Sequence, residues 1–172
     1  MAARQYEGAD NMTDRMAALS TLAVHDKERR AAALEDFYSR HGSDALIVDK
    51  WFSLQATIPE PATLDRVKAL THHPAFSFSN PNRVRALIGA FAMANQKEFN
   101  RPDGAGYKFS AEVVLALDAK NPQLAARLLS TFKSWRALEP TRKSLAEVTL
   151  RQVASAPSLS RDVSDIIERT LA

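Results

Sequence analysis

The chain has 172 residues, of which 45% are apolar and 25% charged, and it carries a net charge of +3 at pH 7. This composition excludes a largely disordered chain, and the absence of cysteine excludes disulfides, thiolate zinc ligands and cysteine nucleophiles. The longest apolar run, Ala86 to Ala94, has nine residues, far fewer than the ~20 that cross a bilayer. Because Met1 to Arg15 also lacks an apolar signal region, we expect no membrane insertion and a cytoplasmic location.

Three segments with apolar residues at helical spacing follow one another near the N-terminus. Asn11 or Thr13 is the expected N-cap of the first, Gly42 is the expected end of the second, and Ser43 is the expected N-cap of the third. The segments are DNMTDRMAALSTLAV, DKERRAAALEDFYSRHG and SDALIVDKWFSLQAT.

The middle of the chain predicts two further helices of different character. A short one runs around Leu64 to Leu70 and ends before Pro74. The next, Pro81 to Asn95, is apolar on almost every face, which is typical of a central, buried helix. Gly89 lies in its middle and costs ~1 kcal/mol relative to alanine, so we expect another backbone to approach closely there.

Two helix starts have the same chemistry. Asn80 and Asn121 are the expected N-caps, and each precedes a proline at the first helical position. These starts lie 41 residues apart, within the ~40–47 residue period of two-helix solenoid repeats. Two last helices follow Pro140, in TRKSLAEVTLRQVAS and SRDVSDIIERTLA. The sequence therefore predicts an all-α fold, an α-solenoid of antiparallel helix pairs of the armadillo or HEAT type, with residues 1–172 as a single helical-repeat domain.

The common catalytic motifs are missing. The four histidines lack the HExxH spacing of a zinc peptidase, and for His72 and His73 we favour a structural place near the final carbonyls of a helix. Gly104 and Gly106 follow a helix rather than a strand and lack the Gly-Lys-Ser/Thr of a phosphate loop. We expect an Asp-Gly turn there, leading into a helix at Ser110. No catalytic residue and no metal ligand is predicted in this chain.

Two arginines stand out from this background. Arg85 and Arg127 occupy early positions in the two helices that begin with the Asn-Pro cap. The planar guanidinium donates two parallel hydrogen bonds to a carboxylate, so these side chains are candidate ligand-binding groups. From the residues alone, surface arginines paired with nearby acids are the default interpretation.

Several long segments, taken in order, closely resemble the C-terminal region of the bacterial aminopeptidase N family, zinc-dependent peptidases that remove N-terminal residues from peptides. The segments are ADNMTDRMAALSTL, DKWFSLQAT, HPAFSFSNPNRVRALIGAFA, DGAGYKF and KNPQLAARLL. The resemblance runs from about Ala9 to Ala172. It implies that the zinc site lies in an earlier catalytic domain of a parent enzyme, so that this chain has no cofactor of its own and is inactive alone.

The resemblance also implies a role for the domain. In the family, this region covers the active site and restricts entry to peptides, and arginines on its inner face approach the C-terminal side of a bound peptide. By motif these are Arg85 in NRVR and Arg127 in LAARLL. The expected partners are peptide substrates and the catalytic domain of the parent chain. The alternative is a free-standing α-solenoid that binds a protein or a nucleic-acid backbone. Because the net charge is only +3 and basic residues are interspersed with acids, we expect no nucleic-acid partner.

Overall fold

The computed structural model describes residues 1–172 as helices joined by turns, without a β-strand. The elements are α1 (Ala2–Gly8), α2 (Met12–His25), α3 (Lys27–His41), α4 (Ala45–Ala56), α5 (Thr63–Leu70), α6 (Pro81–Val84), a π-helical turn (Arg85–Gly89), α7 (Ala90–Ala94), α8 (Gln96–Phe99), α9 (Ala105–Asp118), α10 (Pro122–Leu129), two 3-10 turns (Ser130–Phe132 and Trp135–Ala137), α11 (Pro140–Ala154) and α12 (Arg161–Leu171). The predicted all-α fold is confirmed.

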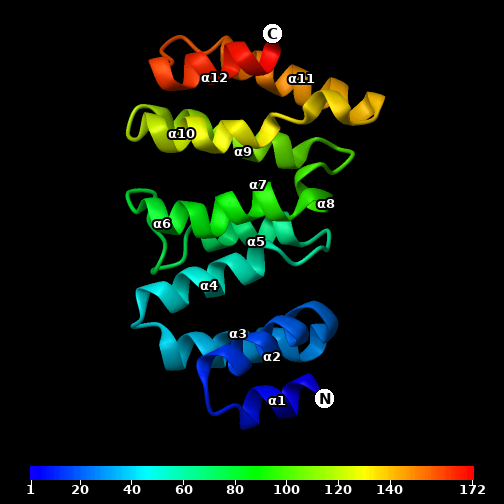
Figure 1. Cartoon of the computed structure of the whole chain (residues 1–172), viewed down its shortest axis with the longest axis vertical. Coiled ribbons are helices and arrows are strands. Elements are labelled where there is room, and N and C mark those ends of the chain that lie inside the picture. The colour runs from blue at the N-terminus through cyan, green and yellow to red at the C-terminus, as the bar shows by residue number, and fades with distance from the viewer.

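The helices stack in two layers along one axis, with the chain termini at opposite ends (Figure 1). The first layer contains α2, α4, the continuous α6–α7 helix, α10 and α12. Ser53 of α4 donates a hydrogen bond to the carbonyl of Ala86 at 2.9 Å, which joins α4 to the α6–α7 helix. Leu128 of α10 contacts Gly89, since a Cβ added to that glycine would lie 4.0 Å from the leucine Cδ2.

The second layer contains α3, α5, α9 and α11. Glu60, just before α5, is shared by Arg30 of α3 and Arg66 of α5. Lys68 of α5 lies over the ring of Phe109 in α9, 5.9 Å from the ring centroid. Because successive helices alternate between the two layers, the chain forms the predicted α-solenoid of paired helices.

The two Asn-Pro starts have the predicted cap geometry. Asn80 Oδ1 accepts the backbone N–H of Asn82 at 3.0 Å, and Asn121 Oδ1 accepts that of Leu124 at 3.1 Å. Both caps open helices of the first layer. The repeat inferred from their spacing therefore corresponds to two consecutive helices of the first layer, α6–α7 and α10.

Several boundaries differ from the sequence-based expectations. Asn11 caps α2 as predicted, but Asp44 rather than Ser43 caps α4, because its carboxylate accepts two backbone N–H groups. The helix expected at Ser110 begins at Ala105, where Asp103 accepts the first free N–H. The short helices α1 and α8 were not predicted, because both are too brief for a periodic apolar pattern.

The close backbone approach lies at a different glycine from the one predicted. At Gly89 a Cβ would meet only ordinary contacts, the nearest being Arg85 Cβ at 3.8 Å. At Gly106 a Cβ would overlap the carbonyl oxygens of Glu98 and Phe99. The first turn of α9 therefore packs directly on the backbone of α8, and this contact requires glycine.

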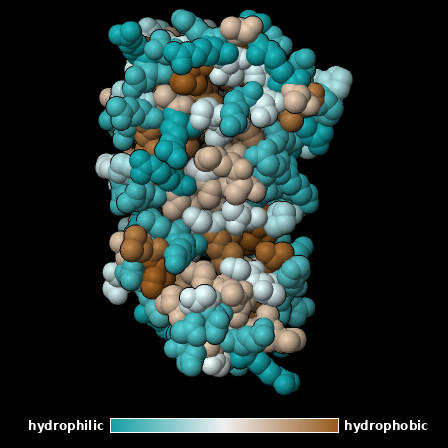
Figure 2. Space-filling model, in the orientation of Figure 1, coloured by the Kyte–Doolittle hydropathy of each residue, from teal (hydrophilic) through white to brown (hydrophobic).

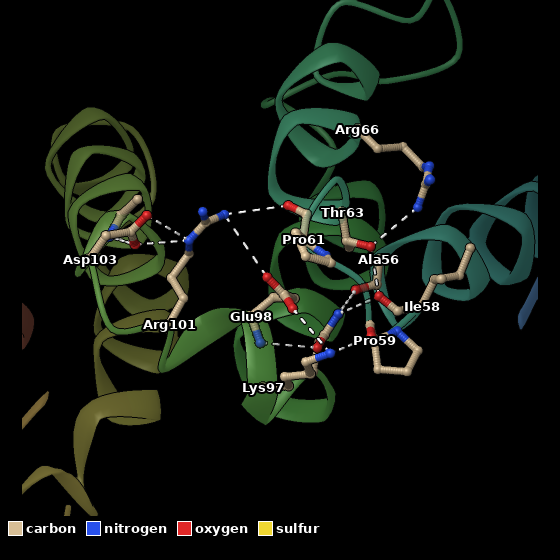
Figure 3. Close-up of polar contacts among 12 residues, drawn as sticks. Ala56, Ile58, Pro59, Pro61, Thr63, Arg66, Lys97, Glu98, Arg101 and Asp103 are labelled. Atoms are coloured by element: carbon tan, nitrogen blue, oxygen red, sulfur yellow. Dashed lines mark hydrogen bonds and ion pairs between the residues drawn. The ribbon is translucent and has the colours of Figure 1, made fainter. Parts of the chain in front are cut away.

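A buried carboxamide joins the α4–α5 loop to the end of α7 (Figure 3). Asn95 Nδ2 donates to the carbonyls of Ala56 and Ile58 at 3.0 and 2.9 Å, and Oδ1 accepts the N–H of Glu98. Lys97 adds a hydrogen bond to the carbonyl of Pro59 at 3.1 Å. Since buried carbonyls need partners, Asn95 supplies a donor to the carbonyl of Ala56 at the end of α4. The carbonyl of Ile58 also accepts the N–H of Glu60 and the hydroxyl of Thr63.

We predict that Asn95→Ala lowers the free energy of unfolding by about 2–4 kcal/mol, because the buried carbonyl of Ala56 loses its donor and the buried N–H of Glu98 loses its acceptor. Urea unfolding followed by circular dichroism measures the change. Gln123→Ala, which truncates an exposed amide on α10, is the matched control and should change stability by less than ~0.5 kcal/mol. Equal stability of the two variants would contradict this role of Asn95.

His73 packs within an aromatic cluster and does not bind the helix-end carbonyls that we expected. Its ring centroid lies 4.8 Å from Tyr38 and 5.2 Å from Trp51. Nδ1 accepts the N–H of Ala75 at 3.1 Å, so this nitrogen is unprotonated. Burial lowers the pKa of His73 below its ordinary value of 6.5, against the opposing effect of Glu35.

This lowered pKa predicts a stability change in mildly acidic solution. The folded state favours the neutral imidazole, so its contribution is complete above pH 6.5 and is lost as the pH falls through the folded pKa. We expect the unfolding free energy to decrease from pH 6.5 towards pH 5. His73→Asn keeps an acceptor and cannot titrate, so the decrease should become smaller, whereas exposed His25→Asn should behave like the parent chain. An unchanged pH profile for His73→Asn would rule the explanation out.

Candidate functional site

Arg85 opens the π-helical turn and is exposed on the first layer. Its Nη1 donates to Asn82 Oδ1 at 3.0 Å, one turn earlier in the same helix. The Cβ of Arg85 lies close to Gly89, one turn later in the same helix. The guanidinium makes no other hydrogen bond within the chain.

Arg127 is also exposed, but it lies in the last turn of α10 rather than in an early turn as expected. The difference arises because α10 ends at Leu129, soon after its cap. The guanidinium of Arg127 makes no hydrogen bond within the chain, whereas its carbonyl accepts the hydroxyl of Ser130 at 2.6 Å. The side chain is therefore free to meet a ligand.

The structure places the two arginines on neighbouring helices of one layer, because Leu128 packs against Gly89. Neither arginine belongs to any ion pair of the chain. The default interpretation, surface arginines paired with acids, is thus wrong for both. Figure 2 shows neutral and apolar side chains gathered in the middle of the view over α4 and α7, with mostly hydrophilic side chains on the flanks and a further apolar group at the left edge. Leu46 and Met93 are exposed apolar residues of these two helices.

Arg83, two residues before Arg85, has the opposite environment. It is 8% exposed, forms an ion pair with Asp49, and donates to the carbonyls of Ala45 and Ala75 at 2.8 and 3.0 Å. These contacts anchor the start of the α6–α7 helix to α4. The sequence motif that contains both arginines does not distinguish the anchor from the exposed side chain.

The histidines do not form a metal centre. His25 and His72 are exposed, and His41 lies against Phe37, with ring centroids 4.9 Å apart. No group of three or more His, Asp or Glu side chains is arranged to hold a metal ion. The residues of this chain therefore do not fit zinc, and we derive no chemical step through a metal here.

None of the helices combines the length and the apolar character that a membrane crossing requires.

The environments of the three arginines predict different effects on stability. Arg85→Ala and Arg127→Ala should each change the free energy of unfolding by less than ~0.5 kcal/mol, since neither removes a partner from a buried group. Arg83→Ala should cost about 3 kcal/mol, because it leaves Asp49 without its cation and the carbonyl of Ala75 without its donor. Denaturant titration of the three variants tests this. A loss above ~1 kcal/mol for Arg85→Ala or Arg127→Ala would assign that side chain a structural role instead.

Comparison with known proteins extends these observations. Residues 1–172 match a family described as "Domain of unknown function (DUF3458_C) ARM repeats". Aminopeptidase N of Haemophilus influenzae is 39% identical over 168 residues, which cover 98% of this chain and 19% of that protein. Aminopeptidase N of Escherichia coli K12 is 37% identical over 172 residues, covering 100% of this chain and 20% of that protein.

A solved structure agrees with these sequence matches. The crystal structure of Legionella pneumophila aminopeptidase A in complex with aspartic acid superposes with a TM-score of 0.92 at 37% identity, over 99% of this chain and 20% of that one. The chain thus spans about one fifth of the length of the relatives that it matches, and the resemblance predicted from the sequence is confirmed. The chain belongs to the DUF3458_C family of ARM-repeat domains and is homologous to the C-terminal part of aminopeptidase N.

Proposed function

We propose that this chain is the substrate-gating domain of a zinc-dependent aminopeptidase, in which it covers the active-site space and controls the access of peptides. The observation that carries the proposal is the match of nearly the whole chain to one fifth of proteins named aminopeptidase N. Zinc and the residues that cleave the peptide bond belong, in this proposal, to the part of the enzyme outside this chain. A zinc ion there supplies an activated water and polarises the scissile carbonyl.

Arg85 and Arg127 are the proposed peptide-binding residues of this domain. Both are exposed cations without an acidic partner, and both project from packed helices rather than from loops. A guanidinium in this situation can donate charge-assisted hydrogen bonds to the carboxylate or carbonyl groups of a peptide. As the family resemblance implies, we assign the arginines to the C-terminal side of the substrate, where its backbone carbonyls are acceptors for the guanidinium.

A nucleic-acid backbone fits this chain less well. Binding to phosphates requires a groove of closely spaced, unpaired cations. In the second layer the basic side chains are largely neutralised, as in Arg30 and Arg66 with Glu60 and in Arg151 with Glu147. In the first layer, Arg85 and Arg127 lie on neighbouring helices that meet at Gly89 and Leu128, and two such cations do not make a continuous basic groove.

The proposal predicts a substrate-dependent effect of the two arginines in a full-length aminopeptidase that contains this sequence. Arg85→Ala or Arg127→Ala should reduce kcat/KM for peptides by roughly ten- to a hundredfold, because one charge-assisted hydrogen bond is worth about 1.5–3 kcal/mol. A single amino acid joined to a chromogenic amide does not reach these side chains, so its hydrolysis should change little. Steady-state kinetics on both substrates measure the contrast.

The control for that experiment is Arg4→Ala, which removes an exposed arginine without an acidic partner from α1 at the far end of the solenoid. It should leave both substrates unaffected. Equal losses on the two substrates for Arg85→Ala or Arg127→Ala would indicate disturbed folding or docking. No loss on either would show that these arginines do not bind substrate.

A further inference from the structure

A cavity of about 330 Å³ lies where the α7–α8 junction meets the two 3-10 turns that follow α10. Its floor is aromatic and buried, and consists of Phe99, Tyr107, Phe132 and Trp135. The exposed residues at its mouth are Met93, Gln96, Lys133 and Ser134. The volume is at the lower end of the ~300–1,000 Å³ typical of ligand pockets, so it suits one large side chain rather than a folded segment.

The floor of this cavity presents apolar surface to a ligand. The hydroxyl of Tyr107 donates to Asn100 Oδ1 at 2.9 Å, and the indole N–H of Trp135 donates to the carbonyl of Thr170 at 2.9 Å. Burial raises the pKa of Tyr107 to about 12, so this phenol stays neutral. Both polar groups are thus paired within the chain, and Arg136 lies over the Trp135 ring, 4.6 Å from its centroid. The buried rings therefore back the cavity with apolar groups, which favour aromatic or aliphatic side chains.

The lining of the cavity carries positive charge and no negative charge. Its lining includes no aspartate or glutamate, and Lys133 is its one ionised side chain. Lys133 is exposed and takes part in no ion pair of the chain. An acidic side chain would have to lose its hydration to enter the cavity. A carboxylate that stays at the mouth would instead lie near the ammonium group of Lys133.

The cavity is adjacent to the candidate peptide-binding arginines. Ser130, which lines it, donates its hydroxyl to the carbonyl of Arg127. Met93 at its mouth lies two turns beyond Arg85 in the α6–α7 helix, past Gly89. The α6–α7 helix and α10 run in the same direction (Figure 1), so the cavity lies at the C-terminal ends of the two helices that carry the arginines.

We propose that this cavity binds the apolar side chain of the C-terminal residue of a peptide, while the free carboxylate of that residue faces Lys133. The inference rests on the proposed function for the identity of the ligand as a peptide. It adds a preference: short peptides that end in a large apolar residue bind this domain better than peptides that end in an acidic one.

The test is an NMR titration of the isotope-labelled chain with acetyl-Gly-Gly-Phe carrying a free carboxylate. We expect saturable shifts of the Met93 methyl and the Trp135 indole N–H, with a dissociation constant in the millimolar range. The indole N–H of Trp51, which is bound to the carbonyl of Leu34 in the N-terminal half of the chain, should not move. The C-terminal amide of the same peptide should bind three- to tenfold more weakly, and acetyl-Gly-Gly-Asp should produce no saturable shift.

Exposed substitutions at the mouth complete the test without affecting the core. Met93→Glu places a carboxylate at the entrance and should abolish the shifts at Trp135. Lys133→Gln should bind the acid as weakly as the parent chain binds the amide. Lys108→Gln, an exposed lysine of α9 outside the cavity lining, is the matched control and should bind like the parent. Circular dichroism checks that each variant remains helical.

Three results would overturn the proposal: no saturable shift at Met93 or Trp135, equal affinity for the acid and the amide, or unchanged binding by Met93→Glu. These outcomes are independent of the kinetic test of Arg85 and Arg127. Saturable binding in the cavity together with unaffected peptide hydrolysis by the arginine variants would retain the cavity and reject Arg85 and Arg127 as substrate-binding residues. Arginine-dependent hydrolysis without binding in the cavity would do the reverse.

Discussion

The hydrogen bonds of Asn95 to the carbonyls of Ala56 and Ile58 hold the solenoid together at its middle. A solenoid has no sheet to align its rungs, so each helix pair depends on contacts with the adjacent pair. At this junction α4 ends, α7 ends and α8 begins within one buried polar cluster (Figure 3). The carboxamide donates to the carbonyl of Ala56 at the end of α4 and accepts the N–H of Glu98 at the start of α8, two groups that helix ends leave unpaired. Gly106 of α9 packs on the backbone of the same α8.

The arginines show how the fold gives one residue type two different roles. Arg83 is buried and therefore requires an acid and two carbonyls as partners, because an unpaired charge in the interior is costly. Arg85 and Arg127 lie on the surface, where water solvates the guanidinium and no acidic partner is needed; Arg85 donates only to Asn82 of its own helix. A ligand can engage such a side chain without first breaking an ion pair. The same helix start thus supplies an anchor and a candidate ligand-binding group.

The candidate site consists of cationic groups beside neutral and apolar surface on a rigid helical layer. Arg127 and Lys133 lie on either side of Ser130, and the aromatic floor lies beneath the same segment. This arrangement suits a ligand with an anion at one end and an apolar group next to it. No group of three or more His, Asp or Glu side chains is arranged to hold a metal ion. Helices hold side chains more precisely than loops do, which agrees with a role in guiding substrate.

The sequence by itself determined the helical class, most helix positions and the solenoid repeat. These features depend on local chemistry. Asn80 and Asn121 are each followed by a proline, a pattern that indicates a helix start, and the apolar spacing that predicts α2 to α5 involves only neighbouring residues. The family resemblance also came from the sequence. It predicted a ligand-binding role for Arg85 and Arg127, which composition and spacing alone would have assigned to ordinary ion pairs.

Only the tertiary structure decided which of these residues are paired and where the backbones meet. The role of Asn95, the burial of Arg83 and the glycine requirement at Gly106 each depend on a partner that is close in space and distant in sequence or on another element. The same is true of the cavity, whose lining comes from segments around Met93, Tyr107 and Trp135. Helix periodicity records which face of a helix is apolar. It does not record which other helix covers that face, because that choice arises from the packing of the whole solenoid.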